Sequence, residues 1–195
     1  MNIPRGDRHI WVNLVDFTAR IVDFDQVTFE TRTVVGASGT QTPEFSDVME
    51  YMEINPDWTL PRSIVAEMWG ALTSGGAGHL DLIDGSGQIV PREYVDIAAY
   101  SPTTLPFEVR QAPGRGNPLG EVKFMFPNPY AIYLHDTPSR SLFRNPVRAY
   151  SHGCVRLADP REFAYALLAA QESDPVSYYH QVQRTWQLTR VNLRT

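Results

Sequence analysis

The only cysteine of this 195-residue chain lies in a segment whose side chains could support nucleophilic chemistry. The segment reads Ser151-His152-Gly153-Cys154-Val155-Arg156, and a second histidine, His135, lies upstream of it. A thiol attacks a carbonyl group as its thiolate, so a catalytic cysteine needs a base or a positive charge nearby. We therefore expect Cys154 to be a nucleophile that is activated by His135, His152 or Arg156.

The backbone around the cysteine could contribute hydrogen-bond donors. Gly153 permits a tight turn directly before Cys154. Successive N–H groups in such a turn, near the start of a predicted helix at Asp159, could stabilise a developing oxyanion.

The elements that must position these residues are mostly predicted strands. Residues 131–137 (AIYLHDT) are strand-like, and a strand would hold the ring of His135 more rigidly than a loop. Residues 138–150 can then loop out and return, which would bring Cys154 back beside His135. Further strands are predicted at 9–15, 27–35, 121–126 and 188–193, with a polar turn at 23–26. Residues 48–58 contain another predicted strand, which ends where Asn55-Pro56 breaks it.

Three helices are predicted from apolar spacing and start signals. The first covers 61–72, and the other two begin at Asp159-Pro160 and Asp174-Pro175, where an acidic N-cap precedes a proline. Residues 73–117 are rich in glycine and proline and show no long periodic element. Such a stretch in a compact domain predicts an insertion, a lid or a binding loop.

Bulk composition narrows the class of protein. Hydrophobic residues make up 43% and charged residues 20%, as in ordinary globular domains. A net charge of −5 argues against non-specific nucleic-acid binding. There is no apolar run long enough to span a membrane, and Met1-Asn2-Ile3-Pro4 does not begin a signal peptide. One cysteine excludes an internal disulfide.

The sequence resembles a known family at these residues. His135-Asp136-Thr137-Pro138, followed by Ser151-His152-Gly153-Cys154, resembles the active-site signature of the YkuD-type L,D-transpeptidase catalytic domain. The segments TPEF, YMEINPDWTLP, NPLGEVKFMFPNPYAIYLHDTPSRSLF and RAYSHGCVRLADPREFA resemble the capped proteobacterial subgroup. Many members have glycine at position 136 and asparagine at position 156, so Asp136 and Arg156 resemble subgroup features.

The resemblance implies a fold. We expect a mainly β protein, a YkuD-type β-sandwich with a few α-helices. Residues 1–195 would form a single catalytic domain in which 62–118 are an inserted capping or lid segment. Similar proteins continue into a further strand after TRVNL, so the domain is expected to be shortened at its C-terminus, and the leader is expected to be absent from this chain.

The resemblance also implies a reaction on peptidoglycan stem peptides in the periplasm or cell envelope. Cys154 would attack the L-centre carbonyl of stem residue 3 and release D-alanine, and an amine acceptor would then take the acyl group. His135 would act as general base and acid, with Gly153, Cys154 and His152 around the oxyanion. Arg156 would bind a substrate carboxylate or lower the pKa of the thiol. The remaining substrate contacts are expected at Tyr133, Thr137, Ser151 and Trp58. No cofactor or metal is implied, and carbapenem inhibitors are expected to acylate the cysteine.

Several alternatives remain open. The same site could use water as acceptor and act as a hydrolase, or the chain could be a silent wall-binding module. Cys154 could be an inert core residue, and His79, His135, His152 and Cys154 could instead form a zinc site. Tyr133, Trp58 and Tyr150 could be core residues, and Ser151 is expected to hydrogen-bond within its loop.

Overall fold

The computed structural model describes residues 5–194, which divide into two compact units. The first, the sheet unit, consists of Met1–Pro56 and Gly114–Thr195. The second, the inserted unit, is Asp57–Pro113 and interrupts the first along the chain. It overlaps the expected insertion at 62–118, and its role as a lid stays a prediction.

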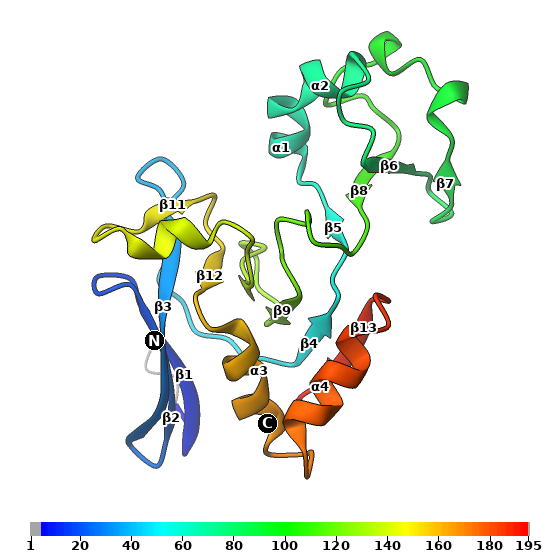
Figure 1. Ribbon diagram of the computed structural model, residues 1–195. Coiled ribbons are helices and arrows are strands. Elements are labelled where there is room, and N and C mark those ends of the chain that lie inside the picture. The colour runs from blue at the N-terminus through cyan, green and yellow to red at the C-terminus, as the bar shows by residue number, and fades with distance from the viewer. Residues whose placement is uncertain (1–4, 195) are drawn as a thin grey trace. The chain divides into compact units, whose positions relative to one another are not determined.

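The sheet unit contains one nine-stranded sheet (Figure 1). The strand order is β1-β2-β3-β12-β10-β9-β4-β13, and β11 pairs with β3 beside this path. Neighbouring strands are antiparallel except for the β10–β12 and β11–β3 pairs, which are parallel. The strands are β1 (Arg8–Asn13), β2 (Thr18–Asp23), β3 (Gln26–Gly36), β4 (Tyr51–Ile54), β9 (Val122–Met125), β10 (Leu134–His135), β11 (Ala149–Ser151), β12 (Val155–Leu157) and β13 (Thr189–Asn192).

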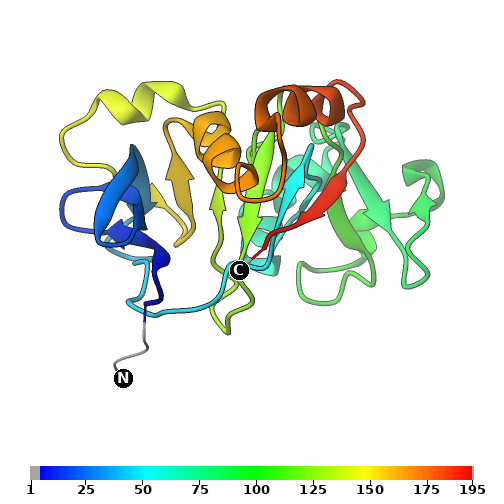
Figure 2. The same cartoon turned by 90° about the horizontal axis from the view of Figure 1, so that it is seen from below.

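Two helices, α3 (Pro160–Leu168) and α4 (Pro175–Gln183), lie against one face of this sheet (Figure 2). A 3-10 helix, η3 (Arg140–Arg144), follows β10. Residues along a strand point alternately to the two faces of the sheet. Every second residue of the central strands therefore enters a core shared with α3 and α4. The core includes Met52, Ile54, Val122, Phe124, Leu134, Val155, Leu157, Phe163, Leu168, Tyr179 and Val191. The fold is mainly β with a few helices, as expected.

The two C-terminal helices begin where the sequence predicts, but only one uses its predicted cap. The Asp174 carboxylate accepts a hydrogen bond from the Ser177 N–H at 3.0 Å. The Asp159 side chain makes no capping bond and instead accepts from the Thr31 hydroxyl at 2.8 Å. The last strand, which had no predicted partner, pairs with β4.

The first hairpin differs from the expected single strand at 9–15. That strand ends at Asn13, whose side-chain oxygen accepts from the N–H groups of Val15 and Asp16. β2 then follows, and both Ile21 and Val22 are buried, so it lacks the alternation that identifies a strand in sequence.

The inserted unit has a sheet and a core of its own. Its sheet order is β5-β8-β6-β7, and buried residues such as Leu72, Leu82 and Val109 form its core. The predicted helix 61–72 is broken at Met68 into two short helices, and the short strands after Thr73 were not predicted. The elements are β5 (Trp58–Thr59), α1 (Arg62–Glu67), α2 (Trp69–Thr73), β6 (Leu80–Ile83), β7 (Ile89–Val90), η1 (Arg92–Tyr94), η2 (Ile97–Ala99) and β8 (Glu108–Gln111).

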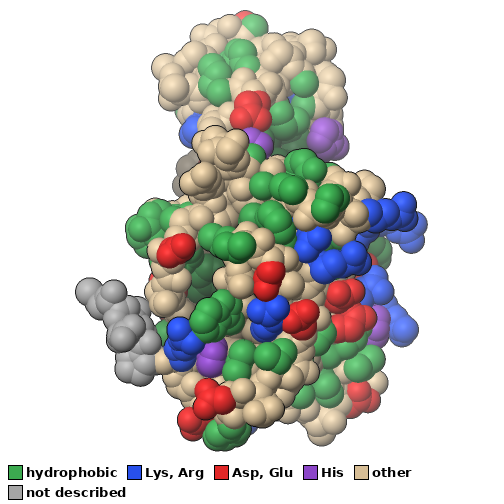
Figure 3. Space-filling view, turned by 90° about the vertical axis from the view of Figure 1, so that its left-hand side faces the viewer, with side chains coloured by type: hydrophobic (Ala, Val, Ile, Leu, Met, Phe, Trp, Pro, Cys, Tyr) green, Lys and Arg blue, Asp and Glu red, His purple; other side chains and the backbone are tan. Residues whose placement is uncertain are grey.

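The surface carries charges of both signs. On the face drawn in Figure 3, acidic and basic side chains are interspersed with hydrophobic ones. Among residues 5–194, no helix combines the length and apolar character needed to cross a membrane.

Candidate active site

Strand alternation places the candidate catalytic side chains on the face of the sheet opposite the core. Leu134 and Val155 point into the core. Because neighbouring strand residues point to opposite faces, His135 belongs to the other face of β10 and Arg156 to the other face of β12. Tyr133 and Cys154, which directly precede these strands, continue the same alternation.

The register of β10 and β12 brings the two segments together. Leu134 is paired with Val155 and His135 with Arg156 in a parallel ladder. The Val155 N–H donates to the Tyr133 carbonyl at 3.1 Å, which continues the contact one step toward Cys154. The structure therefore places His135 on β10 and Cys154 directly before the adjacent strand β12, with Cys154 beside Tyr133 and Arg156 beside His135.

His135 is a buried residue with a fixed ring orientation. Its side chain is only 4% exposed, and Nδ1 lies 2.5 Å from the Asp136 carbonyl oxygen. A carbonyl can only accept, so Nδ1 carries the hydrogen and Nε2 of the neutral ring keeps its lone pair. Burial lowers the pKa of His135 to about 3, and the positive charges of Arg156 and Lys123 act in the same direction. The ring is therefore neutral at physiological pH and can accept a proton through Nε2.

Cys154 is half-buried and its thiol is protonated at rest. Burial raises the pKa of Cys154, while hydrogen bonding with Tyr133 and the charge of Arg156 oppose this rise. Sγ lies 3.8 Å from the Ala131 carbonyl oxygen. Because the imidazole has a low pKa and the thiol a high one, the pair at rest is thiol and neutral imidazole, not a thiolate–imidazolium ion pair.

In the turn before Cys154, one of the predicted oxyanion donors, the Gly153 N–H, is hydrogen-bonded within the turn itself. Gly153 has φ of +114°, a conformation that favours glycine. Its N–H donates to the Ser151 hydroxyl oxygen at 3.1 Å, and that hydroxyl donates to the Cys154 carbonyl. Ser151 thus hydrogen-bonds within its loop. The Gly153 N–H is therefore engaged within the loop, and the Cys154 N–H is the other predicted oxyanion donor of this turn.

Arg156 and Thr137 occupy different environments. Within the described part of the chain, Nε of Arg156 is buried without a hydrogen-bond partner, and burial lowers the pKa of this guanidinium. Thr137 is buried, and its hydroxyl accepts from the Ser139 N–H at 3.2 Å. In this arrangement the Thr137 hydroxyl supports its own turn.

The remaining predicted residues are Trp58, His152, Tyr150 and Tyr133. Trp58 is in the inserted unit, where it packs against that unit's core. His152 is exposed at the surface of the turn. Tyr150 is 45% exposed, and its hydroxyl accepts from the Asn145 side chain. Tyr133 is largely covered, with its ring centroid 5.5 Å from that of His135.

Sequence reasoning missed an ion pair on the same face of the sheet. Lys123 and Glu53 are paired in register across β9 and β4, with Nζ 2.7 Å from the carboxylate, and Lys123 is also in register with His135. Both side chains are only 14% exposed. The alternation of YMEI and VKFM would have indicated their common face, because each charge is flanked by core residues.

No grouping of metal ligands accompanies the pair. Across residues 5–194, no three His, Cys, Asp or Glu side chains gather where they could hold a metal ion. His79, one of the four residues considered for zinc, lies in the inserted unit, whereas the other three lie in the sheet unit.

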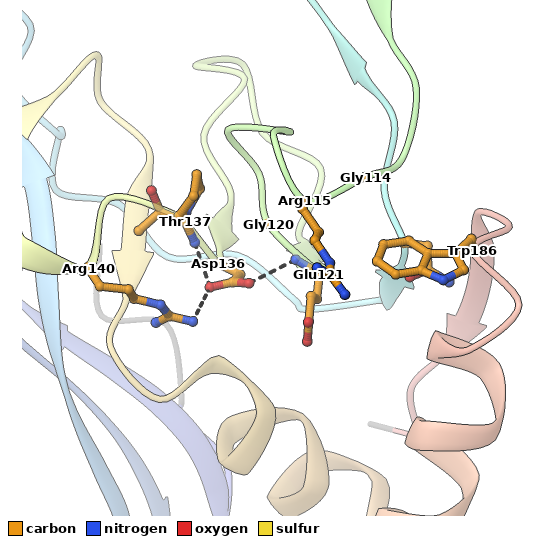
Figure 4. Close-up of a pocket in the computed structure, with 10 residues that line it drawn as sticks. Gly114, Arg115, Gly120, Glu121, Asp136, Thr137, Arg140 and Trp186 are labelled. Carbon is orange, nitrogen blue, oxygen red and sulfur yellow. Dashed lines mark hydrogen bonds and ion pairs between the residues drawn. The ribbon is translucent and has the colours of Figure 1, made fainter.

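A polar pocket lies at the end of β10, beyond His135 (Figure 4). Its carboxylates are bound by arginines: Asp136 pairs with Arg140, and Glu121 forms a two-point pair with Arg161. The pocket does not include Cys154. Its lining residues are Asn55, Gly114, Arg115, Gly120, Glu121, Asp136, Thr137, Pro138, Arg140 and Trp186.

Comparison with known proteins identifies the family of this chain. The family model of the YkuD L,D-transpeptidase catalytic domain matches residues 7–177. A Haemophilus influenzae protein named "Putative L,D-transpeptidase" is 30% identical over 171 residues, which cover 85% of this chain and 35% of that protein. The chain therefore spans about a third of the length of this relative.

A solved L,D-transpeptidase from Mycobacterium smegmatis is a more distant likeness. It is 12% identical with a TM-score of 0.36, and the match covers 82% of this chain and 52% of the other. The match to the family model, which extends over most of the sequence and includes both His135 and Cys154, identifies the relationship. The chain belongs to the YkuD family of L,D-transpeptidase catalytic domains.

Proposed function

We propose that this chain is a peptidoglycan L,D-transpeptidase that works through a thioester on Cys154. The observation that carries the proposal is the parallel pairing of β10 with β12, which sets the Cys154 and His135 segments side by side on the face opposite the core. Membership of the family supports L,D-transpeptidase chemistry. The resemblance implies that the donor is a stem tetrapeptide that ends in D-alanine.

In the first half-reaction, Sγ of Cys154 attacks the L-centre carbonyl carbon of stem residue 3. Because the resting thiol is protonated, Nε2 of His135 takes its proton as the S–C bond forms. The carbonyl oxygen becomes an oxyanion, which the Cys154 N–H stabilises. One such donor contributes on the order of 2.7–4 kcal/mol to lowering a barrier of this kind.

Collapse of the tetrahedral intermediate completes acylation. The C–N bond to D-alanine breaks, and the imidazolium of His135 returns its proton to the leaving amine. D-alanine departs, and the donor stem stays attached to Cys154 as a thioester. His135 ends the step neutral, as it began, and is ready to act as a base again.

In the second half-reaction, a neutral amine from another stem attacks the thioester carbonyl. Nε2 of His135 takes a proton from this amine and delivers it to the departing sulfur. A new amide forms and the thiol is restored. Arg156 lies beside His135 in the register and acts electrostatically on Cys154, so its positive charge favours the sulfur anion that forms as the C–S bond breaks.

The acceptor distinguishes this proposal from its nearest rival. With a purified disaccharide-tetrapeptide, a transpeptidase yields dimers joined by 3-3 crosslinks together with free D-alanine. A hydrolase of the same fold yields only the disaccharide-tripeptide and D-alanine, because water takes the acyl group. Wild type should form dimers, whereas Cys154→Ala should bind the substrate and form no product. Equal binding by both proteins with no turnover by either would support a silent wall-binding module instead.

Two further properties belong to the same proposal. An enzyme with this substrate works in the cell envelope, where peptidoglycan is located. A carbapenem, whose strained ring presents an acyl carbon to a nucleophile, should also acylate Cys154. An unmodified protein mass after carbapenem treatment, with the thiol reduced, would argue against that second property.

A further inference from the structure

We propose that Asp136 and Arg140 are positioning residues that clamp β10, which carries His135, against β12, which directly follows Cys154. This inference rests on the proposed function for its catalytic consequence. We refer to the two side chains and their bonds as the Asp136–Arg140 clamp. Neither residue touches the thiol, and both act through the backbone that carries the reacting groups.

The clamp is needed because the direct pairing of the two strands is short. β10 and β12 share only two residue pairs, Leu134 with Val155 and His135 with Arg156. Short ladders fix register weakly, since few hydrogen bonds and few side-chain contacts oppose a shift. A small displacement of β10 would move Nε2 of His135 relative to Sγ of Cys154.

Arg140 spans from one strand to the other with a single planar group. Nη2 donates to Oδ1 of Asp136 at 2.6 Å, directly after His135. Nη1 donates to the carbonyl oxygens of Leu157 at 3.4 Å and Ala158 at 2.8 Å, at the end of β12. Because the guanidinium is rigid and forked, these bonds fix both strand ends against each other in a way that a point charge cannot.

Asp136 transmits this restraint to the His135 ring. Its carboxylate is 6% exposed and accepts from the N–H groups of Glu121 at 2.8 Å and Thr137 at 2.6 Å (Figure 4). Its own N–H donates to the Val122 carbonyl at 2.9 Å. The carbonyl oxygen of the same residue accepts from Nδ1 of His135. The side chain therefore holds in place the carbonyl that sets the histidine tautomer.

The choice of a charged residue at position 136 supports a geometric role. Burying a carboxylate carries a desolvation cost, and burial raises the pKa of Asp136. The Asp136 carboxylate also restricts position 120 to glycine, since a Cβ there would lie 2.1 Å from Oδ2 of Asp136. A small apolar residue would avoid both costs, so the chain retains the carboxylate for what it binds.

A matched pair of arginine variants tests the clamp. Arg140→Gln removes it, and Arg161→Gln removes a neighbouring arginine–carboxylate pair that does not join β10 to β12. The two arginine side chains have nearly equal exposure, 49% and 48%. Arg140→Lys keeps a charge for Asp136 but shortens the reach to Ala158. The assays are steady-state turnover of the disaccharide-tetrapeptide and nitrogen-15 spectra of the His135 ring, with His135→Gln to assign the signal.

Arg140→Gln should lower kcat by about tenfold to a hundredfold with little change in KM, as expected for a displaced catalytic group. Its His135 signal should change from a single Nδ1-protonated tautomer to a mixture. Arg161→Gln should match wild type in both measurements. The kcat and the His135 spectrum of Arg140→Lys should resemble those of Arg140→Gln. If the glutamine variant does not fold, the lysine variant replaces it in the test.

Wild-type turnover and spectra in Arg140→Gln would overturn the clamp, and so would equal losses in the Arg140 and Arg161 variants. Full activity in Arg140→Lys would show that the fork is not required and would also overturn it. If wild type does not turn over the tetrapeptide, the proposed function fails. The ring spectra then decide the clamp alone, which stands only if Arg140→Gln, and not Arg161→Gln, mixes the tautomers.

Discussion

Replacing Gly120 by alanine should destabilise the sheet unit through backbone strain and a close contact with Asp136. Gly120 has φ of +63°, and a Cβ built on it would lie 2.1 Å from Oδ2 and 2.3 Å from Cγ of Asp136. A left-handed backbone costs a non-glycine residue about 1–2 kcal/mol. Overpacking at a site that cannot relax adds about 1–3 kcal/mol. The two terms together predict a loss of about 2–5 kcal/mol in the free energy of unfolding.

Gly114 provides the matched control, because it lines the same pocket. A Cβ on Gly114 would meet no atom within 4 Å, and its φ lies outside the left-handed region. Gly114→Ala should therefore change stability by no more than about 1 kcal/mol, and in the stabilising direction if the chain is stiffened. The difference between the two variants isolates the contact with Asp136 together with the backbone strain.

The assay is urea unfolding, monitored by hydrogen exchange in peptides from β9. These peptides report the unfolding of the sheet unit separately from that of the inserted unit. Gly120→Ala should show the loss, and it should also slow acylation because Asp136 must move. Equal stability of the two alanine variants would refute the reasoning, since it would mean that neither the left-handed backbone nor the contact with Asp136 carries a cost.

Three further predictions follow from the buried groups. Alkylation of Cys154 by iodoacetamide should keep rising with pH beyond the ordinary thiol pKa of 9.0, because burial raises the pKa of this thiol; a plateau already reached near neutral pH would contradict the neutral pair. Stability should fall as pH drops from 6.5 toward about 3, by up to about 1.4 kcal/mol per pH unit, because the unfolded chain binds a proton at His135 that the folded chain excludes. His135→Gln should flatten that slope in acid titrations followed by urea unfolding, and an unchanged slope would assign the effect elsewhere. Asn55→Ala should cost about 2–3 kcal/mol in the same unfolding assay, because the buried Asn55 amide donates to the carbonyls of Val182, Gln183 and Gln187; a loss below about 0.5 kcal/mol would mean that these carbonyls find other donors.

Local patterns predicted most of the sheet unit. β9 was predicted from the strand-like run EVKFMF, and the starts of α3 and α4 were predicted because an Asp-Pro pair marks each one. β2 was not predicted as a separate strand because Ile21 and Val22 are both buried, which removes the alternation. The inserted unit was the least predictable, since β5, β7 and their partners are two to four residues long and depend on pairing across the chain.

In the candidate site, too, some features could be predicted from the sequence and others could not. Residue types and order indicated Cys154 and His135, and a strand followed by a returning loop indicated that they would meet. Their parallel register could not be predicted, because it depends on β12 inserting between β3 and β10. Arg140 was missed because its partners, Asp136 and Ala158, directly follow two strands that are separate in the sequence. Two further hydrogen bonds likewise depend on the folded turns: the Gly153 N–H donates to the Ser151 hydroxyl, and the Ser139 N–H donates to the Thr137 hydroxyl.

The most direct measurement is the intact mass of the protein after brief exposure to a disaccharide-tetrapeptide, followed by peptide mapping. The account predicts a mass gain equal to the donor minus D-alanine, located on Cys154 and absent from Cys154→Ala. His135→Gln should gain this mass far more slowly. A folded wild-type protein with a reduced thiol that gains no mass, or gains it at another residue, would contradict the account.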